Sequence, residues 1–170
     1  MWIPLHAIIL KGEIIMSLWT YVKGKFTIRF ATDYCFDEDD DVGAGFMKEP
    51  HDIYKVMLKA PRITGSEEDC IFSVDITDQA PYNSIDSEGY LYYEAKIKIK
   101  GHLRDREFEE TDQEVRNFIK YLKEETGYET KFVKGKIKVS NRPFDNFDWR
   151  DNEDYKYQIY DLGEKTEKDN

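Results

Sequence analysis

The sequence predicts an α+β domain of the ferredoxin-like type, in which four strands and two helices follow the order β-α-β-β-α-β. Three observations predict it. Residues Tyr90 to Lys100 alternate strictly between apolar and polar side chains, as a half-buried strand does. A helical pattern follows from Thr111, and three other segments alternate in the same way as the strand. Right-handed crossovers then place the first and third strands in the centre of the sheet and both helices on one face.

The first half of the chain supplies a strand and a short helix. Leu18 to Phe30 alternates as a strand, and Gly24 inside it predicts a β-bulge. Asp33 to Phe46 follows as an acidic loop. Pro50 suits the first turn of a helix, whose apolar stripe stops before Pro61.

The middle of the chain supplies the hairpin that contains the central strand. Cys70 to Thr77 alternates as a second strand with Cys70 on its buried side. The turn-forming residues Asp78 to Gly89 join it to the central strand as an antiparallel neighbour. Gly101 to Phe108 is expected to be a loop that leads into the second helix.

The second helix and the last strand complete the predicted domain. Thr111 and Glu114 fit a capping box, in which each side chain bonds the backbone of the other residue. Gly127 is well placed to end this helix. Tyr128 to Ser140 then alternates as a fourth strand with lysines on its polar face.

We expect four parts in the chain: 1–15 as a non-native N-terminal extension, 16–140 as the ferredoxin-like domain, 141–162 as a docked acidic and aromatic extension, and 163–170 as a disordered tail. Lys11 to Glu13 can be encoded by a purine-rich run that resembles a ribosome-binding site, which favours Met16 as the natural start. The alternative is that Leu5 to Leu10 adds an edge strand to the sheet.

Composition narrows the classes of function. The 170 residues carry a net charge of −10 with a pI near 4.9, which argues against general binding to nucleic-acid backbone and favours a partner with a basic surface. Cys35 and Cys70 fit no disulfide framework or metal spacing. No run reaches the roughly 20 apolar residues of a membrane helix, so we expect no membrane partner.

The outer face of the predicted sheet is a candidate nucleic-acid surface, because aromatic residues alternate with cations on it. The candidate residues are Trp19, Tyr21, Lys23, Lys25, Tyr92, Lys96, Lys98 and Lys136, with Arg29, Lys100, Lys134 and Lys138 on the same face. The alternative is that alternating lysines simply form the solvated side of a half-buried sheet, or that the acidic extension folds back over them.

A second candidate site lies where two predicted loops meet at one end of the sheet, near the start of the second helix. Donors and cations at a helix N-terminus favour an anion. The candidate anion-binding residues are Arg62, Thr64, Ser66, His102, Arg104 and Arg106. The alternative pairs the arginines with neighbouring carboxylates as ordinary ion pairs, and the acids available for this are Asp105, Glu107, Glu67 and Glu68.

Catalysis and metal binding have weaker support in the sequence. His102, Asp105 and Ser66 offer the residue types of a triad, but no nucleophile elbow accompanies them. The acidic run fails as an EF-hand, since Val42 stands where glycine is needed and Lys48 where the bidentate glutamate belongs. We therefore predict no cofactor and no metal, and binding rather than catalysis.

Three short motifs carry a resemblance to a known group. MSLWTYVKG begins at Met16, PRITGSE begins at Pro61, and GHLRDREF begins at Gly101. Over roughly Met16 to Tyr155 the chain resembles small, uncharacterised proteins encoded by bacteriophages and prophages, with similar W-T-Y, TGSE and GHLRDR motifs. The resemblance implies a phage accessory protein in the cytoplasm of a bacterial host cell. Such proteins often inhibit host defence or take over host factors, and the resemblance carries over no catalytic residues.

We accordingly expect a non-enzymatic binding protein that inhibits a host defence factor, either by binding it or by sequestering its ligand. A protein partner would present a basic surface to the acidic loop and extension. A nucleotide-like ligand is the other partner expected. The alternative function is a module that binds nucleotide or single-stranded nucleic acid on its lysine-rich and aromatic sheet face.

Overall fold

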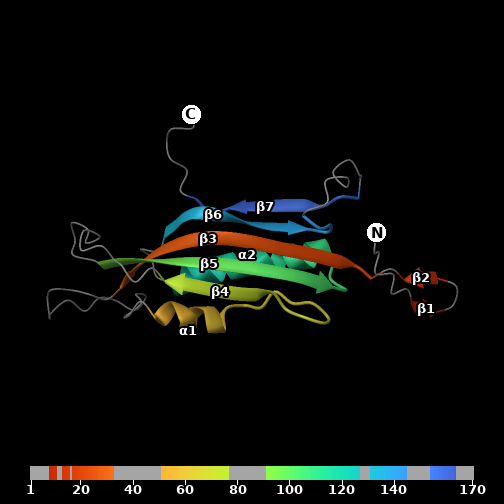
Figure 1. Ribbon diagram of the computed structural model, residues 1–170, viewed down its shortest axis with the longest axis horizontal. Coiled ribbons are helices and arrows are strands. Elements are labelled where there is room, and N and C mark those ends of the chain that lie inside the picture. The colour runs from red at the N-terminus through yellow and green to blue at the C-terminus, as the bar shows by residue number, and fades with distance from the viewer. Residues whose placement is uncertain are drawn as a thin grey trace, which may run out of the picture.

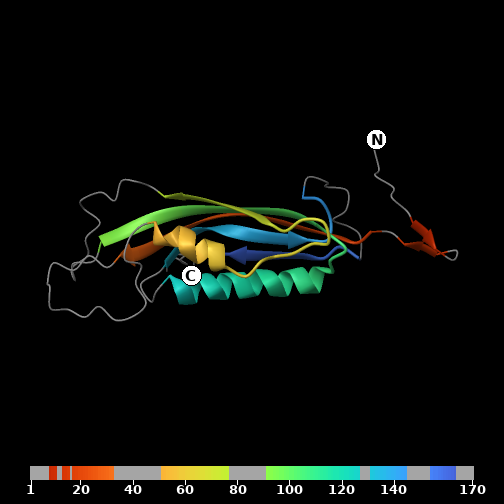
Figure 2. The ribbon, with the colours of Figure 1, turned by 90° about the horizontal axis from the view of Figure 1, so that it is seen from below.

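The computed structural model describes residues 8–10, 13–15, 17–32, 51–76, 91–126, 131–144 and 154–163. This part of the chain forms an α+β domain with a five-stranded antiparallel sheet and two helices. Figures 1 and 2 show the sheet as one layer with the helix α2 (Phe108–Glu125) packed beneath it, while the opposite face of the sheet is open. The predicted α+β class is confirmed.

The sheet contains one strand more than predicted, and its order is β4-β5-β3-β6-β7. The strands are β3 (Trp19–Thr32), β4 (Ile71–Ile76), β5 (Leu91–Arg104), β6 (Lys131–Ser140) and β7 (Tyr157–Asp161). Every neighbouring pair is antiparallel, and β3 in the centre pairs along its whole length with β5. The additional strand β7 comes from the extension after Ser140 and continues the sheet beyond β6.

The two helices lie differently against the sheet: α2 packs on its inner face, and α1 lies at its β4 edge (Figures 1 and 2). They are α1 (Asp52–Lys59) and α2 (Phe108–Glu125), and the hydroxyl of Tyr121 on α2 donates to the carbonyl oxygen of Val56 on α1 at 3.1 Å. Phe118 of α2 stacks on Phe72 at 4.9 Å between ring centroids and meets Phe26 of β3 edge-on at 6.5 Å. These aromatic contacts, at the distances preferred by such pairs, lie in one core between the helices and the sheet.

Two predicted boundaries around α2 are wrong. Gly101 to Arg104 is not loop but the last part of β5, because each of these residues pairs with β3 in register. Thr111 is not an N-cap: α2 begins at Phe108 after the N-cap Glu107, and Thr111 is fully buried inside the first turn. The capping box fails because Glu114 turns its carboxylate to partners outside the helix, described below.

The predicted bulge at Gly24 is also wrong, and the irregularity lies elsewhere in the sheet. Gly24 keeps regular register, and a Cβ there would lie 2.7 Å from Ile99 and 2.9 Å from Ile137, so glycine lets three strands approach closely in the core. The register of β3 with β6 shifts between Thr27 and Ile28, near Gly135 on β6, whose φ is +123°. That shift allows Phe132 to pack against the core.

Several sequence predictions fall outside the described residues. These are the acidic loop Asp33 to Phe46, Pro50 as a helix start, the turn Asp78 to Gly89, Gly127 as a helix stop, and the tail after Gly163. The side chain of Tyr92 also belongs to this group, although its backbone lies in β5. No helix within the described ranges is long and apolar enough to cross a membrane.

The described part of the C-terminal extension packs on the domain at the edge of the sheet rather than over its open face. β7 pairs with β6, and Leu162 at its end is 7% exposed. Tyr160 donates a hydrogen bond to Asp112 of α2, and the ammonium of Lys156 bonds the carboxylate of Glu109 at 2.5 Å. Burial and the Asp112 bond raise the pKa of Tyr160, which therefore keeps its donor proton at neutral pH.

The N-terminal strands β1 (Ile8–Leu10) and β2 (Glu13–Ile15) pair with each other and form a separate two-stranded sheet. They add no strand to the five-stranded sheet, contrary to the alternative of an added edge strand.

We predict that deletion of residues 1–15 leaves the melting temperature within about 2 °C of the full chain, because no described strand of the main sheet loses a partner. Thermal unfolding followed by circular dichroism measures this directly. A fall of about 10 °C would show instead that these residues stabilise the domain.

Candidate functional site

Lysines of β3, β5 and β6 gather on the open face of the sheet, and we call eight of them the lysine face. It comprises Lys23 and Lys25 of β3, Lys96, Lys98 and Lys100 of β5, and Lys134, Lys136 and Lys138 of β6. All are exposed except Lys138, which is half-buried. Their neighbours along the strands, such as Ile97 and Ile137, are fully buried on the helix side. Figure 1 looks onto this face with α2 behind it.

The register of the sheet places lysines directly opposite one another. Lys23 faces Lys100 on one side and Lys138 on the other, and Lys25 faces Lys98 and Lys136 in the same manner. Like charges directly opposite on neighbouring strands are destabilising. Within the described part of the chain, no ion pair neutralises any of the eight.

An aromatic strip borders the lysine face at one end. The rings of Tyr21 and His102, which face each other across β3 and β5, lie 5.3 Å apart. Tyr157 of β7, which is 38% exposed, lies in the same row beyond Ser140, and Trp19, two residues before Tyr21 on β3, lies beside Arg104 of β5. Burial raises the pKa of Tyr21, so its phenol is neutral at physiological pH. Aromatic rings beside a cluster of lysines combine stacking with charge attraction.

The opposite layer of the domain is acidic. The acidic residues within α2 are Glu109, Glu110, Asp112, Glu114, Glu124 and Glu125. Arg116, Lys120 and Lys123 are its basic residues. The net charge of −10 therefore conceals a local division, with the lysine face on one side of the sheet and the acidic helix α2 on the other, although Asp75 and Asp161 stand opposite Lys96 and Lys136 in the register of the sheet.

The two segments of the predicted anion site do meet. The backbone N–H of Ser66 donates to the carbonyl oxygen of Arg104 at 3.0 Å, and its hydroxyl donates to Asp105 at 2.9 Å. Arg104 in turn pairs with Glu67. His102 is apart from this group, because it points outward from β5 beside Tyr21.

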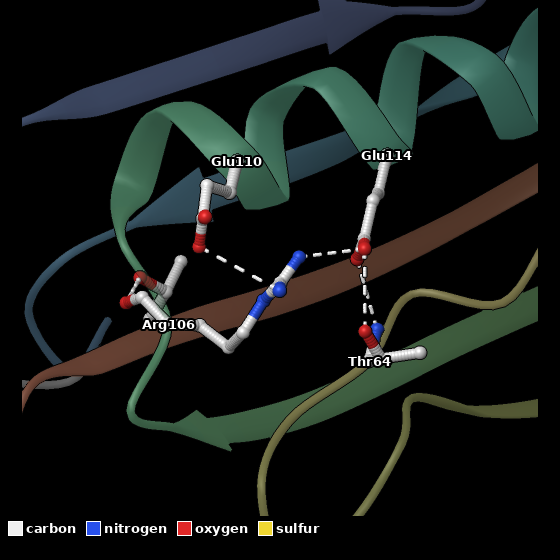
Figure 3. Close-up of polar contacts among 5 residues, drawn as sticks. Thr64, Arg106, Glu110 and Glu114 are labelled. Carbon is white, nitrogen blue, oxygen red and sulfur yellow. Dashed lines mark hydrogen bonds and ion pairs between the residues drawn. The ribbon is translucent and has the colours of Figure 1, made fainter.

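Carboxylates of the chain itself occupy the donors of this region (Figure 3). Arg106 pairs with Glu114 at 2.6 Å and with Glu110 at 3.6 Å. Thr64 donates its backbone N–H and its hydroxyl to Glu114 at 2.9 and 3.2 Å. Arg62, with its side chain 80% exposed, lies 3.4 Å from Asp69. These contacts correspond to the ion-pair alternative, and they leave the lysine face as the less compensated cluster of cations.

We predict that Glu114→Ala destabilises the domain by about 2–3 kcal/mol, since it removes charge-assisted bonds from Arg106 and Thr64 in a half-buried site. Urea unfolding measures the change. The matched control Glu110→Ala removes only a 3.6 Å contact from a side chain 53% exposed, and we expect less than about 1 kcal/mol from it. Equal losses from both variants would contradict the assigned role of Glu114.

The described residues offer little for nucleophilic or metal chemistry. Burial, together with the carboxylates of Glu114, Asp69 and Glu68, raises the pKa of the Cys70 thiol to about 12, so it is protonated at neutral pH. No group of three or more histidine, cysteine or acidic residues in the described ranges is arranged to hold a metal ion. Ser66 bonds Asp105 and not His102, so the triad considered from the sequence is not assembled.

A hollow of about 400 Å³ beside the lysine face was not predicted from the sequence. Its walls come from the loop before β4, from β4 itself and from the last part of β5. The residues that line the hollow include Glu68, Ile71, Lys98, Lys100 and His102. The signal in the sequence was weak, because the hollow depends on how the loop from Gly65 to Cys70 lies against β5.

Comparisons with family models, with curated proteins and with solved structures found no match to the chain.

Proposed function

We propose that the protein is a non-enzymatic binding protein that holds a single-stranded nucleic acid on its lysine face. The observation that carries the proposal is the set of lysines facing one another across β5, β3 and β6 without ion pairs among the described residues. Such an arrangement costs stability in the free protein. A polyanion laid across the face would remove this cost, because each phosphate would lie between cations.

The aromatic strip favours a single strand over a duplex. Bases of a single strand are free to stack on protein rings, whereas those of a duplex are stacked on one another. Lysines at alternate positions of one strand are about 6.5–7 Å apart, a step suited to successive phosphates of an extended chain. Tyr21 and His102 lie at the end of the rows of lysines, where a base of the bound strand would stack on their rings.

This proposal accommodates the phage resemblance through ligand sequestration. A phage accessory protein that binds single strands in the cytoplasm of a bacterial host cell would withhold them from a defence factor. A ferredoxin-like core is proposed with it, supported by β3 and β5 lying side by side with β4 and β6 outside them. Inhibition through a basic protein partner relies on the acidic loop, which is outside the described residues, and on the C-terminal extension, of which 154–163 are described.

The test is binding of fluorescent single-stranded oligonucleotides at low salt, followed by anisotropy. We expect affinity to fall steeply with salt, with a slope of log K against log salt of about −3.5 if roughly five phosphates are contacted. Changing Lys96, Lys98 and Lys136 together to glutamate is expected to abolish binding.

The matched control changes Lys55, Lys59 and Lys120 to glutamate, which alters net charge equally but lies on the helices. We expect this variant to retain most of the affinity, reduced only by its altered net charge. An absence of binding by the unchanged protein at low salt, or equal losses in both triple variants, would refute the proposal.

A further inference from the structure

The hollow next to the lysine face combines cationic, acidic and apolar residues, whereas binding of a phosphate backbone alone requires only the cations. Lys98 and Lys100 line it from β5, and the acidic residues Glu68 and Asp69 line it from the loop before β4. Ile71 contributes an apolar wall and is 71% exposed. A ligand made only of phosphates would be repelled by these acidic residues, so the hollow suits a group with both donors and acceptors and a flat apolar face.

Close packing fixes the loop that carries Glu68. A Cβ on Gly65 would lie 2.7 Å from the carbonyl oxygen of Glu68, and one on Gly101 would lie 2.4 Å from the sulfur of Cys70. The backbone N–H of Cys70 also donates to the carbonyl oxygen of Ile63 at 2.8 Å. These contacts hold the loop against β5 and make the hollow a preorganised site, which lowers the entropic cost of binding.

Glu68 differs from its two acidic neighbours in having no partner among the described residues. Glu67 pairs with Arg104, and Asp69 lies 3.4 Å from Arg62. Glu68 is exposed and makes no hydrogen bond or ion pair with any described residue. Its two carboxylate oxygens are therefore free to accept hydrogen bonds from a ligand.

From these groups we infer that the hollow is a subsite for guanine within a bound single strand, which rests on the proposed function. Guanine is the common base that presents two adjacent N–H donors on its Watson–Crick edge, and these match the two oxygens of Glu68. Its O6 and N7 acceptors suit lysine, as in other sequence-reading proteins. Ile71 and His102 flank the space in which the ring would lie. A volume of about 400 Å³ is sufficient for a nucleotide.

The test compares three oligonucleotides of equal length: one of thymine alone, one with guanine at intervals, and one with adenine at the same positions. We expect the guanine strand to bind about tenfold more tightly than the thymine strand, and the adenine strand to gain no more than about twofold. Glu68→Gln is expected to remove the guanine preference while affinity for the thymine strand changes by no more than about twofold.

Glu67→Gln is the matched control, since it removes the same charge one residue away but does not line the hollow. It should keep the guanine preference. A second measurement titrates guanosine 5′-monophosphate and follows backbone amide signals, with adenosine 5′-monophosphate as its control. We expect shifts at Glu68, Ile71 and His102 with the guanine nucleotide.

These measurements separate the two proposals. If strands bind without a guanine preference and the nucleotide shifts none of these amides, the guanine subsite is refuted while the binding function stands. If the nucleotide shifts these amides but no strand binds, the proposed function fails, and the inferred subsite within a strand fails with it, although the hollow still binds the free guanine nucleotide. A preference that survives Glu68→Gln would also overturn the assignment.

Discussion

Lys25→Glu is expected to stabilise the protein while weakening its binding of single strands. Lys25 stands between Lys98 and Lys136, so glutamate there replaces two repulsive cross-strand pairs with two attractive ones. Each pair contributes roughly 0.2–1 kcal/mol, and together they should raise the free energy of unfolding by about 1 kcal/mol. The same change removes one phosphate contact and adds repulsion, so affinity should fall at least about tenfold.

A gain in stability together with a loss of oligonucleotide affinity distinguishes a lysine face that binds a ligand from one that is only solvated. Melting temperature and oligonucleotide affinity are measured on the same sample, and we expect a rise of about 2–4 °C with the loss of affinity. Added salt should reduce the gain in stability, because it screens the repulsion in the unchanged protein. Lys59→Glu on α1 faces no opposing lysine and serves as control, with neither a rise in melting temperature nor a comparable loss of affinity expected. A fall in stability for Lys25→Glu would contradict this account.

The side-chain directions on β5 were predictable because they depend on local alternation alone. Lys96, Lys98 and Lys100 are exposed, while Ile97 and Ile99 between them are buried, as the strict period of this segment indicated. The predicted direction of these lysines is therefore confirmed. Which lysine stands opposite which was not predictable, because register joins segments more than a hundred residues apart, such as Lys25 and Lys136.

The errors around α2 have a common physical cause, which is that tertiary contacts overrode a local signature. Thr111 and Glu114 have the spacing of a capping box, but Thr111 is drawn into the core and Glu114 bonds Arg106 and Thr64. Asp105 makes the turn between β5 and α2 with φ +56°, a conformation that aspartate tolerates better than most residues. Neither the extra length of β5 nor the hollow beside it follows from residue periodicity.

The bulge near Gly135 shows how one backbone conformation shapes the lysine face. Lys134 and Lys136 lie on the two sides of Gly135 and both belong to the face, while Phe132 packs against the core on the other side of the sheet. In uninterrupted alternation, Phe132 would share the face of Lys134 and Lys136. The register shift resolves this conflict, so the face and the core at this end of β6 depend on the same few residues.

Gly135→Ala is accordingly expected to destabilise the protein by about 3–5 kcal/mol. A φ of +123° is unfavourable for any L side chain, and the added Cβ would lie 2.3 Å from the carbonyl oxygen of Lys25 and 2.4 Å from the Cα of Phe26. Both atoms belong to the backbone of the central strand, so relief requires β3 and β6 to separate. Urea unfolding should show the loss as a lower midpoint.

Gly163→Ala is the matched control for this effect. The nearest atom to its new Cβ would be a carboxylate oxygen of Asp161 at 3.5 Å, which is an ordinary van der Waals contact. We therefore expect the free energy of unfolding to change by no more than about 0.5 kcal/mol. The Gly135 variant should also bind single strands less tightly. This loss of affinity should exceed the loss expected from its unfolded fraction alone, because separation of β3 from β6 moves Lys25 away from Lys136. An alanine at position 135 that left both stability and affinity unchanged would show that the bulge is not required for the lysine face.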